Sequence, residues 1–371
     1  MISISLCMIV KDEEPVIARC LDSVRDLVDE IIVVDTGSSD GTKEIVSGYT
    51  DKIYDFEWTD DFAAARNFSF SLATKEYIMW LDADDILTEE DRSSFRTNRD
   101  SLDPSVSVVM MKYHTAFDEK DRPVFSYYRE RLLRRDRNPR WVGAVHEVIP
   151  RSGKTVYWDT AVTHRKVVTN DPDRNLRIFE KLIRSGAELD LRQQFYYGRE
   201  LMGHGRYEEA ADIFENFLRA KNSWIEDRIT ACRDLFSCRR RMGREDAPEA
   251  LFLSFLYGNP RAEVCCDIGS WFLEKERYET AAWWYEAALR CRREAQGGGF
   301  YSPDCYGFLP CLQLCVCYDR LGDMEKAFSY HKKSQLYKPE NASVLYNEKY
   351  FEAKRSQIPG KEEQERETAV L

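Results

Sequence analysis

The sequence predicts an α/β domain built on a mixed sheet, followed by an all-α solenoid of helical repeats. Up to about residue 113, short β-rich runs alternate with stretches whose apolar residues recur at helical spacing. From about residue 175 the strand patterns disappear and helical spacing alone remains. These observations place the α/β domain at residues 1–168, the helical domain at 169–355 and a polar, flexible tail at 356–371.

In the first domain, strands and helices alternate in the order expected for a parallel sheet with covered faces. The expected strands are "ISLCMIV", "EIIVVD", "KIYDF" and "YIMWLD". The helix after the first strand opens at Pro15, and the next three lie in "DGTKEIVSGY", "FAAARNFSFSLA" and "TEEDRSSFRTN". Four later segments read as strands without long helices between them, so the far side of the sheet is expected to be mixed: "VSVVMMKYH", "FSYYRERLLRR", "WVGAVHEVI" and "TVYWDTAVTH".

The second domain repeats one pattern of helix, turn and helix. It appears in "YYGRELMGHGRYEEAADIFENFL", "WFLEKERYETAAWWYEAAL" and "CVCYDRLGDMEKAFSYHKKSQLYKPEN", with a degenerate copy across residues 228–256. The pattern resembles tetratricopeptide repeats, which have a period of about 34 residues. Such repeats stack into a solenoid with a concave surface, and we expect their aromatic residues to form its packed core.

Composition excludes several classes of partner. The 54 Lys and Arg residues are outnumbered by 65 Asp and Glu, which argues against non-specific binding to nucleic acid. No apolar run approaches the roughly 20 residues of a membrane-spanning helix, and the start of the chain lacks a basic leader, so we expect a cytoplasmic protein without an integral membrane segment. The eleven cysteines are expected to be reduced core thiols rather than disulfides or zinc ligands.

The stretch "YIMWLDADD" runs an apolar strand directly into Asp82, Asp84 and Asp85. Carboxylates this close repel one another, and a shared cation with oxygen ligands explains them best. The clusters "KDEE", "DTGSSDGT" and "TDDFAAARN" also follow or flank predicted strands. Because ligands gather at the carboxyl ends of parallel strands, we expect the four clusters to form one site. Helix capping is an equal alternative for Asp40 and Asp85.

Two other chemistries of acidic loops also use closely spaced carboxylates. An EF-hand is excluded because Ile86 and Leu87 occupy the positions that need an oxygen ligand and a glycine. An aspartyl phosphohydrolase would use Asp82 as nucleophile and Asp84 as acid and base. That family usually carries its acidic pair after the first strand, with Thr or Val where this chain has Ile86, so the phosphohydrolase is the weaker alternative.

The ordered segments "CMIVKDEE", "VVDTGSSDGT", "FAAARN", "WLDADD" and "WVGAVHE" closely resemble the inverting family-two glycosyltransferases of GT-A fold. The resemblance covers roughly residues 3–165. It extends to the second half, because a branch of these enzymes carries tetratricopeptide repeats. That branch resembles, among others, transferases that glycosylate peptide cysteines in bacteriocins.

The resemblance implies a role for each of several side chains at the donor. Asp35 would bind the uracil or ribose edge of the nucleotide, Asp82 the ribose hydroxyls and Asp84 a Mg²⁺ or Mn²⁺ ion. The other implied roles are nucleotide contact for Glu13, base or diphosphate binding for Arg66, and support of the loop for Asn67.

At the acceptor side, the resemblance in "VGAVHEVI" makes Glu147 the catalytic base, since a carboxylate with an ordinary pKa of about 4.3 is ionised at neutral pH. His164 resembles the late histidine that completes the metal shell, and its imidazole suits Mn²⁺ better than Mg²⁺. His146 is expected to be structural or to face the acceptor. Three arginines in "RERLLRR" either meet phosphate or lie on a solvated strand face: Arg131, Arg134 and Arg135.

Together these expectations describe an enzyme that moves a sugar from a UDP-sugar donor to an acceptor with the help of Mn²⁺ or Mg²⁺. The repeats would dock the acceptor or a second copy of the chain as a homo-oligomer. A peptide or protein acceptor is favoured over a saccharide or lipid, because solenoid surfaces commonly bind peptides. The alternative of another class is a repeat scaffold with an inactive transferase domain.

Overall fold

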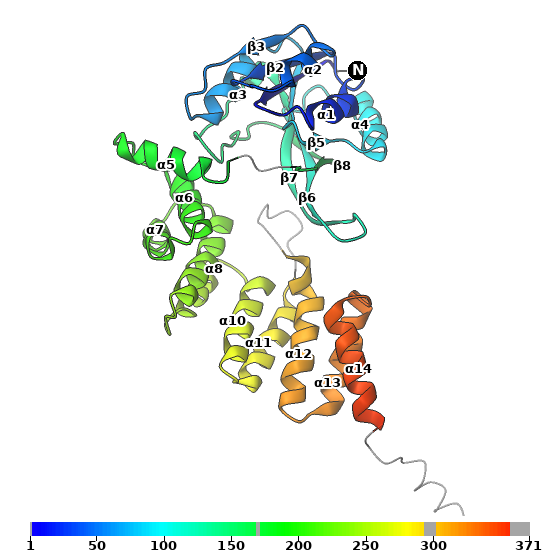
Figure 1. Ribbon diagram of the computed structural model, residues 1–371, viewed down its shortest axis with the longest axis vertical. Coiled ribbons are helices and arrows are strands. Elements are labelled where there is room, and N and C mark those ends of the chain that lie inside the picture. Colours follow the sequence, from blue (N-terminus) through cyan, green and yellow to red (C-terminus); the bar gives the residue numbers. More distant parts are fainter. Residues whose placement is uncertain (1, 168–170, 293–301, 357–371) are drawn as a thin grey trace, which may run out of the picture. The chain divides into compact units, whose positions relative to one another are not determined.

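The computed structural model describes residues 2–167, 171–292 and 302–356, and it divides into two compact units (Figure 1). The first unit comprises Met1–Ser223, and the second begins at Trp224. The helices that directly follow the sheet therefore belong to the first unit. The predicted domain limits at residues 168 and 355 stay predictions. Beyond Ser356, the predicted tail lies outside the described residues.

An eight-stranded mixed sheet forms the centre of the first unit, which confirms the predicted fold class. Its strand order is β3-β2-β1-β4-β7-β6-β8-β5. The strands β1 to β4 pair in parallel, β7 is antiparallel to β4 and β6, and β8 is parallel to β6. The strands are β1 Ile4–Val10, β2 Glu30–Asp35, β3 Ile53–Asp55, β4 Tyr77–Trp80, β5 Asp85–Ile86, β6 Val108–Phe117, β7 Pro123–Arg134 and β8 Thr155–His164.

Helices cover both faces of this sheet, as expected for a parallel arrangement. In β1, Leu6 belongs to the apolar cluster that includes α1 and α4, whereas its neighbour Cys7 belongs to the cluster that includes α3. Successive strand residues point to opposite faces, so β1 contributes to both cores. The helices of the sheet domain are α1 Ile17–Val24, α2 Thr42–Ser47, α3 Phe62–Ser71 and α4 Glu89–Ser101, with a short 3-10 helix at Arg135–Arg137.

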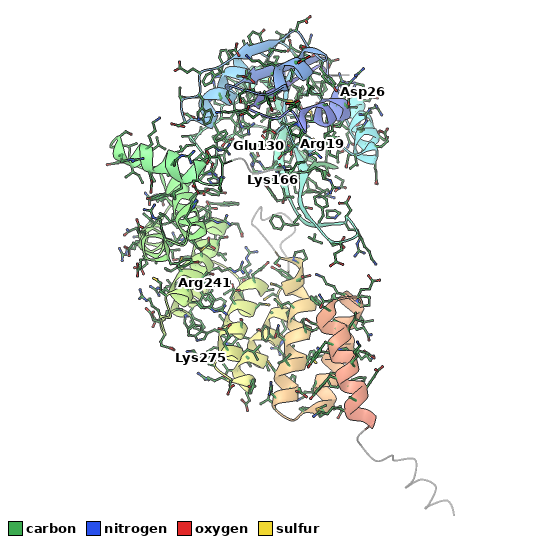
Figure 2. All side chains as sticks on the ribbon, viewed as in Figure 1. Arg19, Asp26, Glu130, Lys166, Arg241 and Lys275 are labelled. Atoms are coloured by element: carbon green, nitrogen blue, oxygen red, sulfur yellow. The ribbon has the colours of Figure 1, made fainter. Side chains whose placement is uncertain are left out.

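The short strand β5 was not expected, and it has a decisive effect on the site. Residues 81–84 carry the chain from β4 to β5, which pairs antiparallel with β8 so that Asp85 lies opposite His164. Next to this pair, Arg165 N donates a backbone hydrogen bond to Asp84 O at 2.9 Å. Arg19 of α1 also donates to the main-chain oxygen of Arg165, and Figure 2 labels Arg19 close to the next residue, Lys166. The end of β8 is thereby tied to the acidic loop.

The expected strand "WVGAVHEVI" is wrong, because residues 141–149 form a loop closed by a single bridge between Val142 and Val148. Gly143 has φ +99° and His146 has φ +53°, and these left-handed values interrupt an extended strand. Trp141 and Ile149 are nevertheless buried. The apolar pattern of this segment indicated burial correctly but not the backbone conformation.

Helical hairpins follow the sheet, as the repeat pattern predicts. Within α6, a Cβ added at Gly198 would lie 2.8 Å from the ring of Phe214 on α7, so only glycine allows this close approach. Gly269 on α10 meets Tyr285 on α11 in the same way, at 3.0 Å and with the same spacing in the chain. The helices are α5 Arg174–Arg184, α6 Leu191–Gly203, α7 Tyr207–Arg219, α8 Ile225–Arg241, α9 Glu249–Leu253, α10 Ala262–Glu274, α11 Tyr278–Arg290, α12 Phe308–Arg320, α13 Met324–Tyr337 and α14 Ala342–Ser356, with 3-10 helices at Ser254–Leu256 and Pro303–Tyr306.

The cysteines are all free, and all are buried except Cys291, which is half-buried. This agrees with the expected core thiols. Among the described residues, no helix has the length and apolar character needed to cross a membrane.

Candidate functional site

Three of the predicted site residues end or follow adjacent parallel strands. Asp35 is the last residue of β2, and the register pairs it with Val10 at the end of β1, three residues before Glu13. Asp82 follows β4, which pairs with β1 on its other side. The carboxyl ends of these strands therefore bring Asp35, Glu13 and Asp82 to one edge of the sheet, as predicted.

The loops after β1 and β2 are joined by hydrogen bonds. Ser39 N donates to Asp12 Oδ1 at 2.7 Å, and Gly41 N donates to Glu14 Oε2 at 2.9 Å. Asp40 accepts from Thr42 N at 3.0 Å and from Glu14 N at 3.1 Å. The N-cap of α2 is Gly41, so Asp40 joins the two loops and is not the helix N-cap. These bonds hold the acidic loops in place before any ligand binds.

Asp35 is almost fully buried, and only one of its two oxygens is satisfied. Its Oδ1 accepts the backbone N–H groups of Gly37 and Ser38, both at 2.9 Å. Its Oδ2 is buried and has no hydrogen-bond partner among the described residues. Because buried polar atoms are nearly always bonded, Oδ2 is suited to accept an N–H or O–H group from a ligand.

Arg66 joins two of the predicted site carboxylates. Its Nε donates to Glu147 Oε1 and its terminal nitrogen to Asp82 Oδ1, both at 2.7 Å. Burial by itself would raise the pKa of Asp82, but the positive charges of Arg66 and Arg131 lower it to about 2. Arg66 therefore fixes Glu147 and Asp82 relative to each other, and its predicted contact with a nucleotide stays a prediction.

Two tryptophans enclose the Arg66 guanidinium, which lies 5.2 Å from the ring of Trp80 and 4.8 Å from that of Trp141. Asn67 holds the same loop, as expected. Its side chain donates to the main-chain oxygen of Trp141 and accepts from the nitrogen of Trp141, both at 2.9 Å. The loop that carries Glu147 is thus anchored to α3.

Asp85 and Arg131 form an ion pair in which neither side chain is exposed, with 3.0 Å between Oδ2 and the guanidinium. Asp85 also accepts from Tyr113 Oη at 2.8 Å and from Asp82 N at 3.1 Å. Asp85 therefore does not cap the next helix, where Thr88 is the N-cap.

The alternatives considered for Arg131 are both wrong, because it meets a buried carboxylate and lies on no solvated face. The two neighbouring arginines have other partners. Arg134 binds the main-chain oxygen of Pro104, and Arg135 binds that of Lys75 at 2.6 Å.

Asp84, Asp85 and His164 offer ligand atoms within 4.8 Å of one another. His164 Nδ1 lies 3.2 Å from Asp84 Oδ1 and 3.3 Å from Asp85 Oδ1. Because Asp85 is already bound to Arg131, Asp84 and His164 are the two side chains best suited to a divalent ion. A carboxylate and an imidazole fit Mn²⁺ by their chemistry.

Two groups at this cluster have pKa values above their ordinary range. Burial alone would lower the pKa of His164, but its hydrogen bonds to Asp84 and Asp85 raise it to about 10. Burial and the negative charges of Asp84 and Asp82 raise the pKa of Glu13 to about 7. Glu13 therefore lies in the field of the same carboxylates as the predicted ion.

Two cations near Glu147 were missed from the sequence. Arg129 lies 5.0 Å from the Trp80 ring. Burial alone would lower the pKa of Arg129, but the charge of Glu130 raises it above its ordinary value, with smaller contributions from Tyr127, Glu147 and Asp82. A β-bulge lies at Arg131, so the alternation of side chains along β7 does not by itself predict that Arg129 and Arg131 both meet Trp80. Arg174, on α5, lies 4.6 Å from the ring of Phe62. The negative charges of Glu147 and Glu13 interact electrostatically with its guanidinium. Nothing local in the sequence indicates that α5 contributes a cation here.

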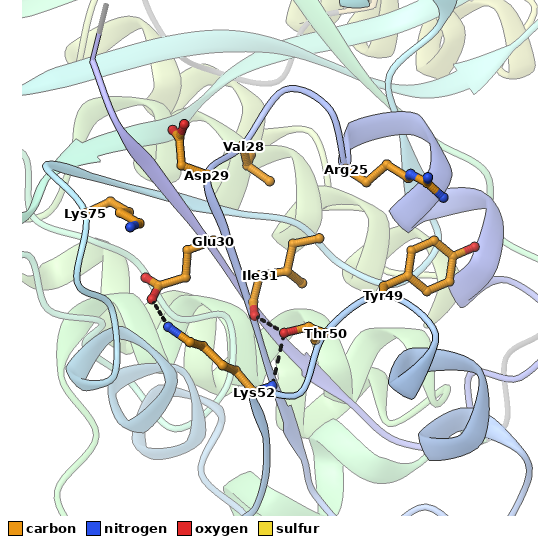
Figure 3. Close-up of a pocket in the computed structure, with 9 residues that line it drawn as sticks. All are labelled: Arg25, Val28, Asp29, Glu30, Ile31, Tyr49, Thr50, Lys52 and Lys75. Atoms are coloured by element: carbon orange, nitrogen blue, oxygen red, sulfur yellow. Dashed lines mark hydrogen bonds and ion pairs between the residues drawn. The ribbon is translucent and has the colours of Figure 1, made fainter.

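A hollow of about 330 Å³ lies at the opposite end of β2 and is not this site (Figure 3). Glu30, the first residue of β2, lines it and binds Lys52. Glu30 also accepts from the backbone and hydroxyl of Thr74, both at 2.9 Å. Its carboxylate is already satisfied, and no predicted site residue lines this hollow.

The substitution Arg131→Met is expected to lower the free energy of unfolding by about 3–5 kcal/mol, because it leaves the Asp85 carboxylate buried without its cation. Arg137→Met is the matched control. Arg137 is exposed, so its replacement is expected to change stability by less than about 0.5 kcal/mol. Urea unfolding of the three proteins measures the difference. Equal stability of Arg131→Met and the wild type would show that the pair does not support the loop.

Binding of Mn²⁺ at about pH 8 is expected to release about one proton, because the ion needs the neutral imidazole of His164. The apparent affinity should rise with pH, since the ion competes with that proton. Calorimetry in two buffers of different ionisation enthalpy counts the protons released. His164→Gln should bind Mn²⁺ more weakly and release none, whereas proton release equal to that of the wild type would place the ion elsewhere.

The sequence of the first unit is similar to that of known proteins. Residues 5–153 match the family model described as glycosyl transferase family 2. A TPR repeat-containing protein of Synechococcus elongatus is 38% identical over 153 residues, which cover 41% of this chain and 36% of that protein. The SPbeta prophage-derived glycosyltransferase SunS of Bacillus subtilis is 27% identical over 239 residues, or 61% of this chain and 56% of the relative. The chain thus spans about a third to a half of these relatives.

Among solved structures, YrrB, a TPR protein, covers 48% of this chain with 18% identity and a TM-score of 0.37. Such a TM-score is too low to argue from, so the repeat character of the second half rests on its own helical hairpins. The chain therefore carries a domain of glycosyl transferase family 2, followed by a helical region of the TPR type.

Proposed function

We propose that this protein is an inverting glycosyltransferase that uses a UDP-sugar and a divalent ion, with Glu147 as the catalytic base. The observation that carries the proposal is the bridge from Arg66 to Glu147 and Asp82, beside the cluster of Asp84 and His164. These side chains lie within or next to the segment that matches glycosyl transferase family 2. They combine a base, nucleotide-binding carboxylates and an ion site.

The nucleotide part of the donor would bind at the ends of β1, β2 and β4. The unpartnered Oδ2 of Asp35 supports this, because it can accept an N–H or O–H group from the uracil or ribose. Asp82 would accept the ribose hydroxyls, and Glu13 would lie beside the nucleotide. A divalent ion held by Asp84 and His164 would neutralise the charge that develops on the departing diphosphate.

In the transfer step, Glu147 would remove a proton from the acceptor's O–H, S–H or N–H group. The acceptor atom then forms its bond to the anomeric carbon while the bond between that carbon and the diphosphate oxygen breaks. The nucleoside diphosphate leaves with the electron pair, and the configuration inverts. Arg66 binds Oε1 of Glu147, and Oε2 has no hydrogen bond to a described residue, so Oε2 is the oxygen suited to take the proton.

A peptide or protein side chain is the acceptor that we favour. Two arguments support it: TPR-type solenoids present concave surfaces that bind peptides, and the ordered motifs resemble transferases that modify peptide cysteines. A saccharide or lipid acceptor is the alternative. The choice can be tested by offering the protein short peptides that contain Cys, Ser or Asn, together with donor and Mn²⁺.

Glu147→Gln is expected to lower sugar transfer by about 10²–10⁴-fold while leaving the binding of UDP with Mn²⁺ unchanged, because the amide cannot accept the proton. Asp84→Asn should instead weaken that binding. The exposed Glu119 provides the control, since Glu119→Gln should behave as the wild type. Radiolabelled transfer and calorimetry give the two readouts.

If the Glu147→Gln variant transferred sugar at the wild-type rate, Glu147 would not be the base. Failure of the wild-type protein to turn over any common UDP-sugar in the presence of Mn²⁺ would favour the inactive-domain scaffold.

A further inference from the structure

The loop that carries Glu147 has an unusual backbone and needs outside support. Its two ends are joined by reciprocal hydrogen bonds between Val142 and Val148, of 2.9 and 3.1 Å. Between them, His146 adopts φ +53°, a left-handed conformation that non-glycine residues rarely take. Such conformations persist only where the surroundings impose them, so the contacts of His146 determine how the next residue, Glu147, is presented.

Those contacts come from the helices that follow the sheet domain. His146 Nε2 lies 2.8 Å from Glu200 Oε1 on α6. The imidazole stacks on the ring of Tyr196, also on α6, with 4.1 Å between centroids and 14° between planes. Arg192 donates to the main-chain oxygen of His146 at 3.4 Å. Helix α6 thus contacts the Nε2 atom, the ring face and the main-chain oxygen of His146.

Glu200 is itself held in place, so it can act as a fixed anchor. Asn175 of α5 donates to its Oε1 at 3.1 Å. Burial alone would raise the pKa of Glu200, but the hydrogen bonds to His146 and Asn175 lower the pKa below its ordinary value. Glu200 lies in the same compact unit as the sheet, in the helix α6 labelled in Figure 1. It touches none of the predicted donor-binding residues through a hydrogen bond within the described residues.

We propose that Glu200 is a positioning residue for the transfer reaction: through His146, it holds the 141–149 loop so that Glu147 faces Arg66. Helix α6, supported by α5, is then a part of the catalytic unit in addition to any role in docking an acceptor. This inference rests on the proposed role of Glu147 as base. It concerns the orientation of Glu147 and assigns no chemistry to Glu200 itself.

The test compares Glu200→Ala, Glu200→Gln and the control Glu208→Ala in the full chain. Glu208 is exposed on the neighbouring helix α7. Glu200→Ala is expected to lower kcat by about 10- to 100-fold, because a small displacement of a catalytic group is that costly. Its Kd for UDP with Mn²⁺ should match the wild type, because Glu200 has no hydrogen bond to a predicted donor-binding residue. Glu200→Gln, which keeps an oxygen acceptor, should recover most of the kcat, and Glu208→Ala should be unaffected.

Hydrogen exchange gives a readout that does not depend on turnover. The amides of Val142 and Val148 should exchange faster in Glu200→Ala, while those of β1 and β4 stay protected. His146→Asn serves as the second variant if Glu200→Ala fails to fold, because asparagine tolerates a positive φ but loses the stacked ring.

Unchanged exchange and kcat in both variants would overturn the inference. A fall in kcat accompanied by an equal fold-loss of affinity for UDP with Mn²⁺ would also overturn it, since that result indicates a general structural role. If the wild-type protein transferred no sugar, the proposed function would fail, whereas the exchange data would still decide whether Glu200 restrains the loop.

Discussion

The buried ion pair between Arg131 and Asp85 is the interaction on which the candidate site depends. Both charges are removed from water, so removing either one would leave the other buried without its partner. One terminal nitrogen of Arg131 makes the hydrogen bonds, and its other two nitrogens have no hydrogen-bond partner among the described residues. Arg131 lies 3.9 Å from the Trp80 ring and 4.4 Å from the Tyr113 ring, and it also donates to the main-chain oxygen of Trp80 at 3.2 Å. Asp85 in turn accepts from Tyr113 and from the backbone of Asp82. The loop between β4 and β5 is therefore fixed from within.

This pair explains how the chain can place three aspartates at the end of one strand. Each carboxylate has its own positive partner: Asp85 binds Arg131, Asp82 binds Arg66, and Asp84 lies beside His164. Of these positive charges, only the proton on His164 can be replaced by a metal ion without leaving a buried arginine unpaired. The arrangement thus separates two carboxylates that hold the structure from one that is available to an ion. The same Arg66 extends the network to Glu147, so the ion site and the proposed base belong to one set of ion pairs.

Much of the fold could be predicted from the sequence, because it is encoded locally. Alternating strand and helix periods gave the parallel half of the sheet, and the repeated glycines and aromatics gave the hairpins, where Gly198 packs against Phe214. The edge at which the carboxylates meet followed from the rule for parallel strands. The proposed roles of these side chains stay predictions.

The errors arise where distant segments decide the outcome. Nothing near Asp85 indicates that its partner is Arg131, or that two residues of β5 pair with β8. The segment 141–149 has the apolar content of a strand, yet Gly143 and His146 take left-handed values that depend on contacts with α3 and α6. Its apolar residues are buried in either conformation, so composition cannot distinguish a strand from a buried loop.

The central claim is that the acidic edge is preassembled by buried cations and completed by a divalent ion at Asp84 and His164. Anomalous diffraction at the manganese edge, from crystals of the full chain grown with Mn²⁺ and UDP, tests it most directly. We expect one manganese peak within coordination distance of both side chains, with Asp85 still bound to Arg131. A manganese ion bound elsewhere, or none at saturating Mn²⁺ and UDP, would contradict the account.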